Sequence, residues 1–219
     1  MRELVADFAV ETATTLLFTS PVVEIGARPA PGQEALFDLR SQFPGLEFIG
    51  TDMQEGPRVD RVEDVHRLTF EGDSVGGVYA LDTLEHVADP LRAMQEIWRV
   101  LKPGGIAVIT SVMFFPIHEH PSDYWRFTPE GFAQLLAPFE TSLAFSHGWE
   151  PLPDTVFGIG IKGPGHLERA QFPKTDARCR DWGKATPVDF GPLRMTTRDL
   201  WRRTLTETSA AVGRRLKRS

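Results

Sequence analysis

The residues best suited to chemistry lie in one short run, FFPIHEHPSDYWRFTPEGF, at positions 114–132. His118 and His120 are candidate general bases, because imidazole gains and loses a proton near neutral pH. Such a base would remove the proton from a hydroxyl or a protonated amine that is receiving a group. A carboxylate acceptor would need no base, and Arg126 could then hold an anionic substrate through two hydrogen bonds.

Other uses of this run remain open. Phe115 and Tyr124 are candidates for the wall of a substrate site. His118 and His120 also form an H-x-H pair, but with only Glu119 or Asp123 to complete it this is a weak metal signature. Asp123 could instead pair with Arg126 and shape the loop, and we weigh that structural role equally with a functional one.

The elements that must position these residues alternate between strand-like and helix-like segments. Apolar runs predict strands at 21–26, 46–52, 59–63, 74–81, 106–113, 140–146 and 154–161. Periodicity and capping residues predict helices at 4–18, 33–43, 90–101, 128–137 and 196–217. This alternation is typical of an α/β fold with a doubly wound, mostly parallel sheet. The sheet's ligand is expected beyond the carboxyl ends of the strands.

The turn after the first predicted strand reads VVEIGARPAPGQ, residues 22–33. Gly26 allows the backbone to approach a ligand closely. The run lacks the Gly-Lys-Ser/Thr of a phosphate-binding loop and the G-x-G-x-x-G spacing of a dinucleotide site. Glu24 also disfavours a nearby phosphate. The turn therefore favours a ligand with an adenosine but no phosphates, and it argues against a nicotinamide oxidoreductase.

Acids stand at the ends of three successive predicted strands, namely Glu24, Asp52 and Asp64. A carboxylate at the end of the second strand can accept hydrogen bonds from both hydroxyls of a ribose. Met53, which follows, can lie on an adenine face. Asp64 could accept from the adenine amino group.

The segments VVEIGA, IGTD, VEDVHRLTF and LEHVADPLRAMQEIWRVLKPGG together resemble the class I S-adenosylmethionine-dependent methyltransferases, in particular their type 11 branch, over residues 20–146. The resemblance implies a Rossmann-like sheet of seven strands, mostly parallel with an antiparallel last strand and helices on both faces. It also implies an enzyme that transfers a methyl group from S-adenosyl-L-methionine to an oxygen or nitrogen of a small molecule. The cofactor-binding residues that it implies are Glu24, Gly26, Asp52, Asp64, Val65, Leu81, Asp82 and His86.

The chain departs from this family in the opening loop. In this chain, Arg28 and Ala30 replace two glycines of the family's pattern E-x-G-x-G-x-G, and Pro29 and Pro31 lie beside them. Proline fixes φ and removes an N–H donor, so this turn is stiffer and donates less. Arg28 could pair with the cofactor carboxylate or be exposed at the loop tip. The altered loop also motivates an alternative function, a non-catalytic S-adenosylmethionine-binding regulatory or partner protein.

Composition and charge indicate the protein's partners and its location in the cell. The 219 residues carry a net charge of −6, with eight basic and two acidic residues in 194–219 and therefore −12 on residues 1–193. The acidic body argues against nucleic-acid binding, and the basic end predicts a solvated helix or a weak surface contact. One cysteine and no bilayer-length apolar run predict a cytoplasmic protein. We expect a methyltransferase domain at 1–162 and a C-terminal extension at 163–219 that acts as a lid or arm, and a homodimer is left open.

Overall fold

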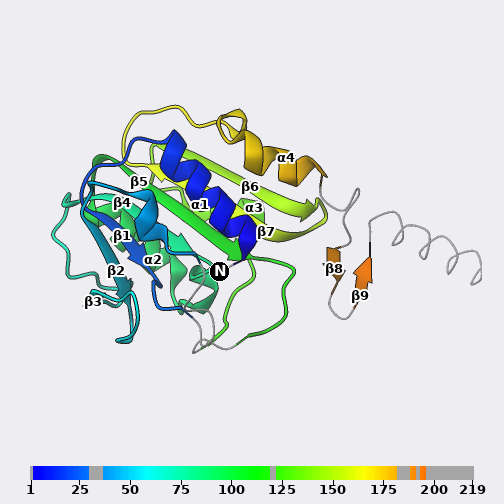
Figure 1. Ribbon diagram of the computed structural model, residues 1–219, viewed down its shortest axis with the longest axis horizontal. Helices are drawn as coiled ribbons and strands as arrows, with labels where there is room; N and C mark the ends of the chain where they lie inside the picture. Colours follow the sequence, from blue (N-terminus) through cyan, green and yellow to red (C-terminus); the bar gives the residue numbers. More distant parts are fainter. Residues whose placement is uncertain (1, 30–36, 119–121, 182–187, 191–192, 196–219) are drawn as a thin grey trace, which may run out of the picture.

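A seven-stranded sheet forms the centre of the molecule (Figure 1). The computed structural model describes residues 2–29, 37–118, 122–181, 188–190 and 193–195. The strands are β1 (Val22–Ile25), β2 (Phe48–Asp52), β3 (Arg61–Val62), β4 (Val75–Leu81), β5 (Leu101–Val112), β6 (Thr141–Trp149) and β7 (Leu152–Ile161). Their order is β3-β2-β1-β4-β5-β7-β6, and β7 runs antiparallel to both of its neighbours. The predicted doubly wound sheet with an antiparallel last strand is confirmed.

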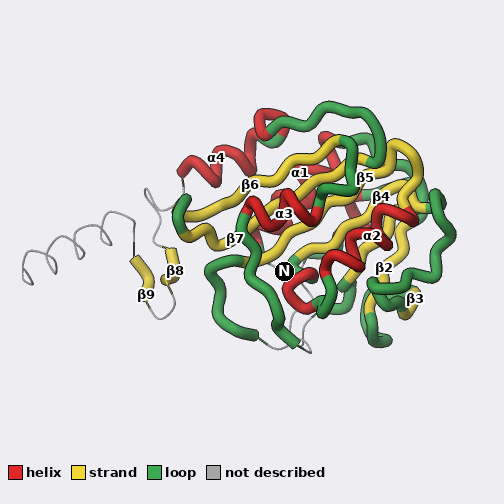
Figure 2. Tube along the Cα trace, turned by 180° about the vertical axis from the view of Figure 1, so that it is seen from behind, coloured by secondary structure: helices red, strands yellow, loops and turns green. Residues whose placement is uncertain are grey.

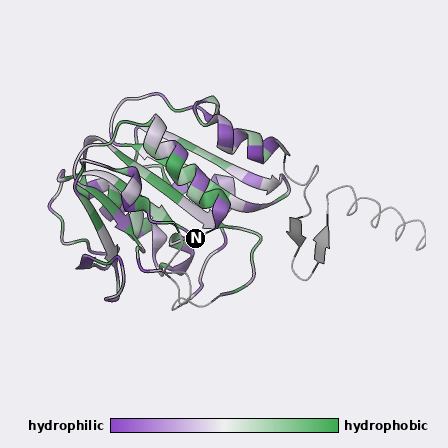
Figure 3. Cartoon of the chain, in the orientation of Figure 1, coloured by the Kyte–Doolittle hydropathy of each residue, from purple (hydrophilic) through white to green (hydrophobic). Residues whose placement is uncertain are grey.

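Helices cover both faces of the sheet. Helices α1 (Glu3–Thr15) and α4 (Pro173–Asp181) lie on one face, and α2 (Pro90–Val100) and α3 (Pro129–Leu135) lie on the other (Figures 1 and 2). The alternation of β4 divides the apolar core accordingly: Val78 and Ala80 pack toward α2 and α3, whereas Tyr79 packs toward α1. Figure 3 shows hydrophobic residues gathered in the strands and on α1, while α4 is largely hydrophilic.

The segment from α2 to β5 follows its sequence signals closely. Asp89 caps α2 by accepting from the backbone N–H of Arg92 at 3.0 Å, and proline occupies the first turn. The strand that follows was predicted from residue 106. It is already paired with β4 at Leu101, and the ladder resumes at Ile106 after a register shift. Residues 102–105 thus form an irregular bulge that connects the helix directly to the central strand.

The predicted helix over 33–43 is wrong where the structure describes it. Residues 37 and 38 are not helical, and Leu39–Gln42 forms a single 3-10 turn, η1. The side chain of Asp38 accepts from the N–H of Arg40 at 3.0 Å, so it starts a new, short turn at this position. The first part of the prediction, residues 30–36, lies outside the described residues.

The described part of the C-terminal extension packs on α1. The 3-10 turn η3 (Arg169–Gln171) leads into α4, and Phe172 between them is fully buried in the core on the α1 side. The carboxylate of Glu11 accepts from the backbone N–H groups of Lys174 and Thr175 at 2.7 and 2.8 Å and from the Thr175 hydroxyl at 2.6 Å. It therefore satisfies the start of α4, which joins residues 163–181 to the main body.

Among the described strands, β8 (Val188–Phe190) and β9 (Leu193–Met195) pair with each other and form a second sheet. The predicted helix at 196–217 lies outside the described residues. Among the helices that the structure describes, none is long and apolar enough to cross a bilayer.

Candidate active site

A turn without side-chain bulk lies at the carboxyl end of β1. Gly26 has φ +79°, a conformation that favours glycine, and its N–H donates to the carbonyl of Thr51 at 2.9 Å. A Cβ at this position would lie 2.7 Å from Oγ1 of Thr83, the residue two after β4. The glycine is therefore required for the ends of β1 and β4 to come together, and it stays exposed at the rim.

Asp52 lies beside this turn at the end of β2. Its side chain is half-buried, and its Oδ1 accepts from the N–H of Gln54 at 3.0 Å. Its Oδ2 has no hydrogen-bond partner among the described residues. Met53, directly after it, is 59% exposed. A carboxylate with spare acceptor capacity next to an exposed apolar side chain suits a sugar and the ring attached to it.

Glu24 is buried beneath the glycine turn. Burial raises the pKa of Glu24 to about 7, and the nearby carboxylate of Asp38 raises it further, whereas Arg58 and Arg40 act in the opposite direction. Near neutral pH this carboxyl thus holds a proton for part of the time, so it can donate as well as accept a hydrogen bond.

Arg28 and Asp64, two of the predicted cofactor residues, are exposed and hydrogen-bonded to nearby residues of the chain. Arg28 is exposed, and its Nη1 donates to Oε1 of Gln54 at 2.5 Å, so the side chain reaches back over the loop after β2. Asp64 is exposed and accepts from the backbone N–H of His66 at 2.9 Å and faces its Nδ1 at 2.7 Å. Both hydrogen bonds lower the pKa of Asp64, and the bond from the backbone N–H has the larger effect. Contact of either side chain with the cofactor stays a prediction.

Val65 and Leu81 are both buried, Val65 in the core cluster toward α2 and Leu81 at the end of β4 in the cluster toward α1. Asp82 follows Leu81 with φ +48°. It pairs with Arg2 through two bonds of 2.9 and 2.8 Å and accepts from the hydroxyl of Thr110 at 3.0 Å. The predicted methionine end is thus closed on one side by the residue before α1. Arg2 could not be found from the sequence, because its contact with Asp82 spans 80 positions.

A cluster that the sequence revealed only in part lies after β4 and β5, and we name it the Glu85 cluster: Glu85, His86 and His118. Glu85 is fully buried in the short turn η2 (Leu84–His86), and its Oε2 accepts from the hydroxyl of Ser111 at 2.6 Å. Burial raises the pKa of Glu85 to about 7, with Asp82 contributing. The rings of His86 and His118 lie edge to face with centroids 4.8 Å apart. Glu85 was missed because a buried acid cannot be told from a solvated one in sequence.

The loop after β5 is held by an ion pair. Arg126 binds Asp123 through two bonds of 2.5 and 2.7 Å, and these hold the pKa of Asp123 well below its usual range. The structural pairing weighed for these residues is therefore present. Phe115 and Tyr124 are 38% and 54% exposed on the same loop. His120 and Glu119 lie outside the described residues.

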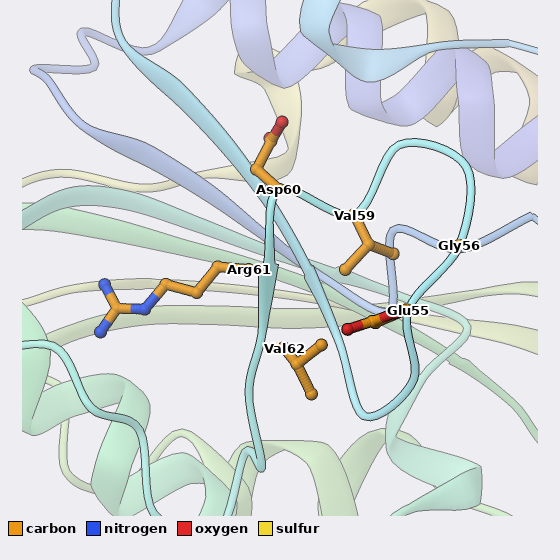
Figure 4. A pocket seen from close by; sticks show the side chains of 6 residues that line it. All are labelled: Glu55, Gly56, Val59, Asp60, Arg61 and Val62. Carbon is orange, nitrogen blue, oxygen red and sulfur yellow. The ribbon is translucent and has the colours of Figure 1, made fainter.

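A surface recess of about 450 Å³ lies at the β3 edge of the sheet, lined by Glu55, Gly56, Val59, Asp60, Arg61 and Val62. Figure 4 shows Glu55, Val59 and Val62 pointing into it and Arg61 pointing away. None of its lining residues is a predicted site residue, although Val62 lies opposite Asp52 in the strand register. We therefore place the candidate site at the strand ends and not in this recess.

Fold and strand-end residues together define a doubly wound protein whose sheet ends suit an adenosine-containing ligand, and comparisons with known proteins agree. The family model described as a methyltransferase domain matches residues 31–109. A Mycolicibacterium smegmatis protein described as a probable S-adenosylmethionine-dependent methyltransferase is 25% identical over 195 residues, which cover 82% of this chain and 73% of that protein.

Two solved structures share the fold. One is the methyltransferase in complex with the Haloferax volcanii Trm112 methyltransferase activator, with 19% identity and a TM-score of 0.53 over 75% of this chain and 91% of that chain. The other is the YcgJ protein from Bacillus subtilis, with 15% identity and a TM-score of 0.53 over 75% of this chain and all of that chain. The family-model match and the Mycolicibacterium smegmatis relative support a class I S-adenosylmethionine-dependent methyltransferase with S-adenosylmethionine as its cofactor.

The residues at the strand ends fit this cofactor. Gly26 itself adds no side-chain atoms to the rim beside Asp52, and Oδ2 of Asp52 can accept from ribose hydroxyls. Met53 offers an exposed apolar surface to the adenine. The structure describes residues 26–29 of the altered glycine loop, and there the backbone turn at Gly26 is retained.

Proposed function

We propose that the enzyme methylates an oxygen or nitrogen atom of a small-molecule acceptor and that His118 takes up the acceptor's proton. When bound, S-adenosylmethionine supplies a methyl group on a positively charged sulfur. The protein's own residues align the acceptor, exclude water and hold the departing proton. His120 is proposed as a second base from the sequence alone.

The observation that carries this proposal is the pairing of His118 with Asp123. Oδ2 of Asp123 accepts from the backbone N–H of His118 at 2.8 Å and lies 3.2 Å from its Nδ1. A carboxylate beside Nδ1 places the ring proton there, so Nε2 carries the lone pair that can accept a proton. A histidine oriented by a carboxylate in this way is the usual arrangement of a general base.

The loop's other residues support an uncharged or cationic acceptor. Arg126 donates through Nε to the carbonyl of Phe115 at 3.3 Å, and its two Nη atoms bond Asp123 and the carbonyls of Pro116 and Trp125. These contacts engage all five N–H donors of the guanidinium, so anchoring an anionic substrate would require breaking the Asp123 pair. The exposed rings of Phe115 and Tyr124 offer apolar surface to the acceptor instead.

We also propose the wider organisation expected from the sequence. Residues 1–162 would form the methyltransferase domain, and residues 163–219 a C-terminal extension that acts as a lid or arm. Its basic residues would make a weak contact with an anionic surface. The enzyme would work in the cytoplasm, as one chain or as a homodimer.

The test replaces His118 by alanine and by glutamine and follows transfer of an isotope-labelled methyl group to a panel of hydroxyl and amine acceptors. We expect turnover to fall about 100-fold or more, the usual worth of a positioned base, while the affinity for S-adenosylhomocysteine changes less than about twofold. His166→Ala is the matched control, because that side chain is 75% exposed. Retained turnover in both His118 variants, or a collapse of cofactor affinity, would contradict the assignment.

A further inference from the structure

The Glu85 cluster has the composition and spacing of a metal site, and we propose that it binds one divalent transition-metal ion of the zinc type. One carboxylate oxygen of Glu85, one ring nitrogen of His86 and one of His118 all lie within 4.8 Å of one another. The three residues come from two segments, the turn after β4 and the loop after β5, so the fold brings them together.

Each imidazole is oriented by an oxygen acceptor, and the two acceptors belong to residues that follow each other in the sequence. Nδ1 of His86 lies 2.6 Å from the carbonyl oxygen of Ser122, and Nδ1 of His118 lies 3.2 Å from Oδ2 of Asp123. A carbonyl or carboxylate oxygen can only accept, so each Nδ1 carries the ring proton and each Nε2 holds a lone pair. This is how metal-binding histidines are held in proteins, by a carbonyl or carboxylate behind the ring.

Glu85 supplies an independent indication that a cation belongs here. Its side chain has no exposed surface, and while Oε2 is bonded to Ser111, the buried Oε1 has no hydrogen-bond partner in the described structure. The nearby guanidinium groups are engaged elsewhere, that of Arg2 with Asp82 and that of Arg126 with Asp123. A buried carboxylate oxygen without a partner is costly, and a metal ion would compensate it directly.

The donor set selects the kind of metal. Two imidazole nitrogens and one carboxylate suit zinc, cobalt or nickel, whereas magnesium and calcium prefer sites made of oxygen atoms. Three protein ligands leave a fourth position open for water or another ligand. Ligand atoms around one tetrahedral zinc lie about 3.3 Å apart, so the cluster must contract by up to about 1.5 Å. His118, on the loop after β5, is the member placed to move.

A consequence follows if His118 is the base, and only this consequence rests on the proposed function. The metal would occupy the same Nε2 lone pair that takes up the acceptor's proton, so the two uses exclude each other. Zinc is then an inhibitor of methyl transfer, and removing it with a chelator restores turnover.

The test uses the full chain without an affinity tag, since a histidine tag binds the same metals. Zn²⁺ and Co²⁺ are titrated by calorimetry, and the visible absorption of bound Co²⁺ reports its coordination number. We expect one equivalent to bind in a four- or five-coordinate site, with affinity lowered at least about tenfold in His118→Ala and in Glu85→Gln. His166→Ala is the matched control and should bind as the wild type does. Circular dichroism checks that each variant is folded, and the His118 variant keeps the proposal testable should Glu85→Gln fail to fold.

Either of two results would overturn the proposal: absence of stoichiometric Zn²⁺ and Co²⁺ binding, or binding that persists in the His118 and Glu85 variants. The first would favour a protonated amine of the acceptor as the partner of Glu85. Metal binding and methyl transfer are measured separately, so failure of one proposal is distinguishable from failure of the other.

Discussion

Replacing Asp52 by alanine tests the adenosine site most directly. Oδ1 already accepts from the N–H of Gln54 at 3.0 Å, which leaves Oδ2 and part of Oδ1 for two ribose hydroxyls. Hydrogen bonds to a charged group are worth about 1.5–3 kcal/mol each, but water can replace part of them at a half-exposed rim. We therefore expect Asp52→Ala to lose about 2–3 kcal/mol in total, or about 30- to 150-fold in Kd. Asp52→Asn keeps one acceptor oxygen and should lose about 1 kcal/mol.

The assay is calorimetric titration of S-adenosylhomocysteine into each variant at one salt concentration. Glu71→Ala is a suitable control, because Glu71 is exposed and precedes β4, at the opposite end of the strands from Asp52. Circular dichroism and urea unfolding should show that all variants are folded. A Kd for Asp52→Ala within about twofold of the wild type, with the control unchanged, would refute the assigned ribose contact.

Three further predictions concern the residues that support the site. Glu11→Ala leaves two N–H groups and the Thr175 hydroxyl without their acceptor, so urea unfolding should show a loss of about 3 kcal/mol, and a loss below about 1 would contradict the cap. Gly26→Ala should lower stability by about 2 kcal/mol and weaken cofactor binding; adding Thr83→Ala should recover part of the stability, because it removes the 2.7 Å contact but not the cost of φ +79°. The pKa of Glu24 is raised in the folded state to about 7, so its stabilising contribution is present at low pH and is lost as pH rises through that value. The free energy of unfolding of the wild type should therefore fall relative to Glu24→Gln by about 3 kcal/mol between pH ~4.5 and ~7, and parallel pH profiles would count against a buried Glu24.

Local signals predicted the sheet because they agree with its tertiary environment. The strand predicted at 74–81 has only glycines and hydrophobic residues after Ser74, and it occupies the interior of the sheet as β4, where all seven residues from Val75 to Leu81 are buried. Asp89 and Pro90 predicted the start of α2 because capping acts through neighbouring residues, which the sequence contains in full. The same holds for Thr128, whose side chain accepts from Gly131 at the start of α3.

Two predicted elements differ from the structure, the helix at 33–43 and the start of the strand at 106. Residues 33–43 have helical periodicity, but Asp38 can cap a turn at its own position, and in the described part that turn prevails. The sequence could not show that the strand predicted from residue 106 begins at Leu101. The proline and glycines at 103–105 indicate a turn between two elements, and not a bulge within one strand. The second error follows from tertiary pairing that no short window contains.

The site divides in the same way. The positions of Asp52 and Gly26 could be predicted because both lie at strand ends, which the sequence locates. Arg2 and Glu85 could not, since their importance comes from contacts with residues far along the chain: Asp82 for Arg2, and Ser111 and the histidines for Glu85. Burial turns an ordinary glutamate into a group with an unusual pKa, and burial is a property of the folded chain.

Asp123 connects the two proposals made for this loop. The Asp123 side chain is only 2% exposed, and both of its carboxylate oxygens bind Arg126. Oδ2 also contacts the backbone N–H and the ring of His118. Removing this one group would release Arg126 toward an anionic acceptor and at the same time free the His118 ring to rotate. Acceptor charge preference and the orientation of His118 therefore depend on the same ion pair, so a change in one without the other is not expected from any substitution at this position.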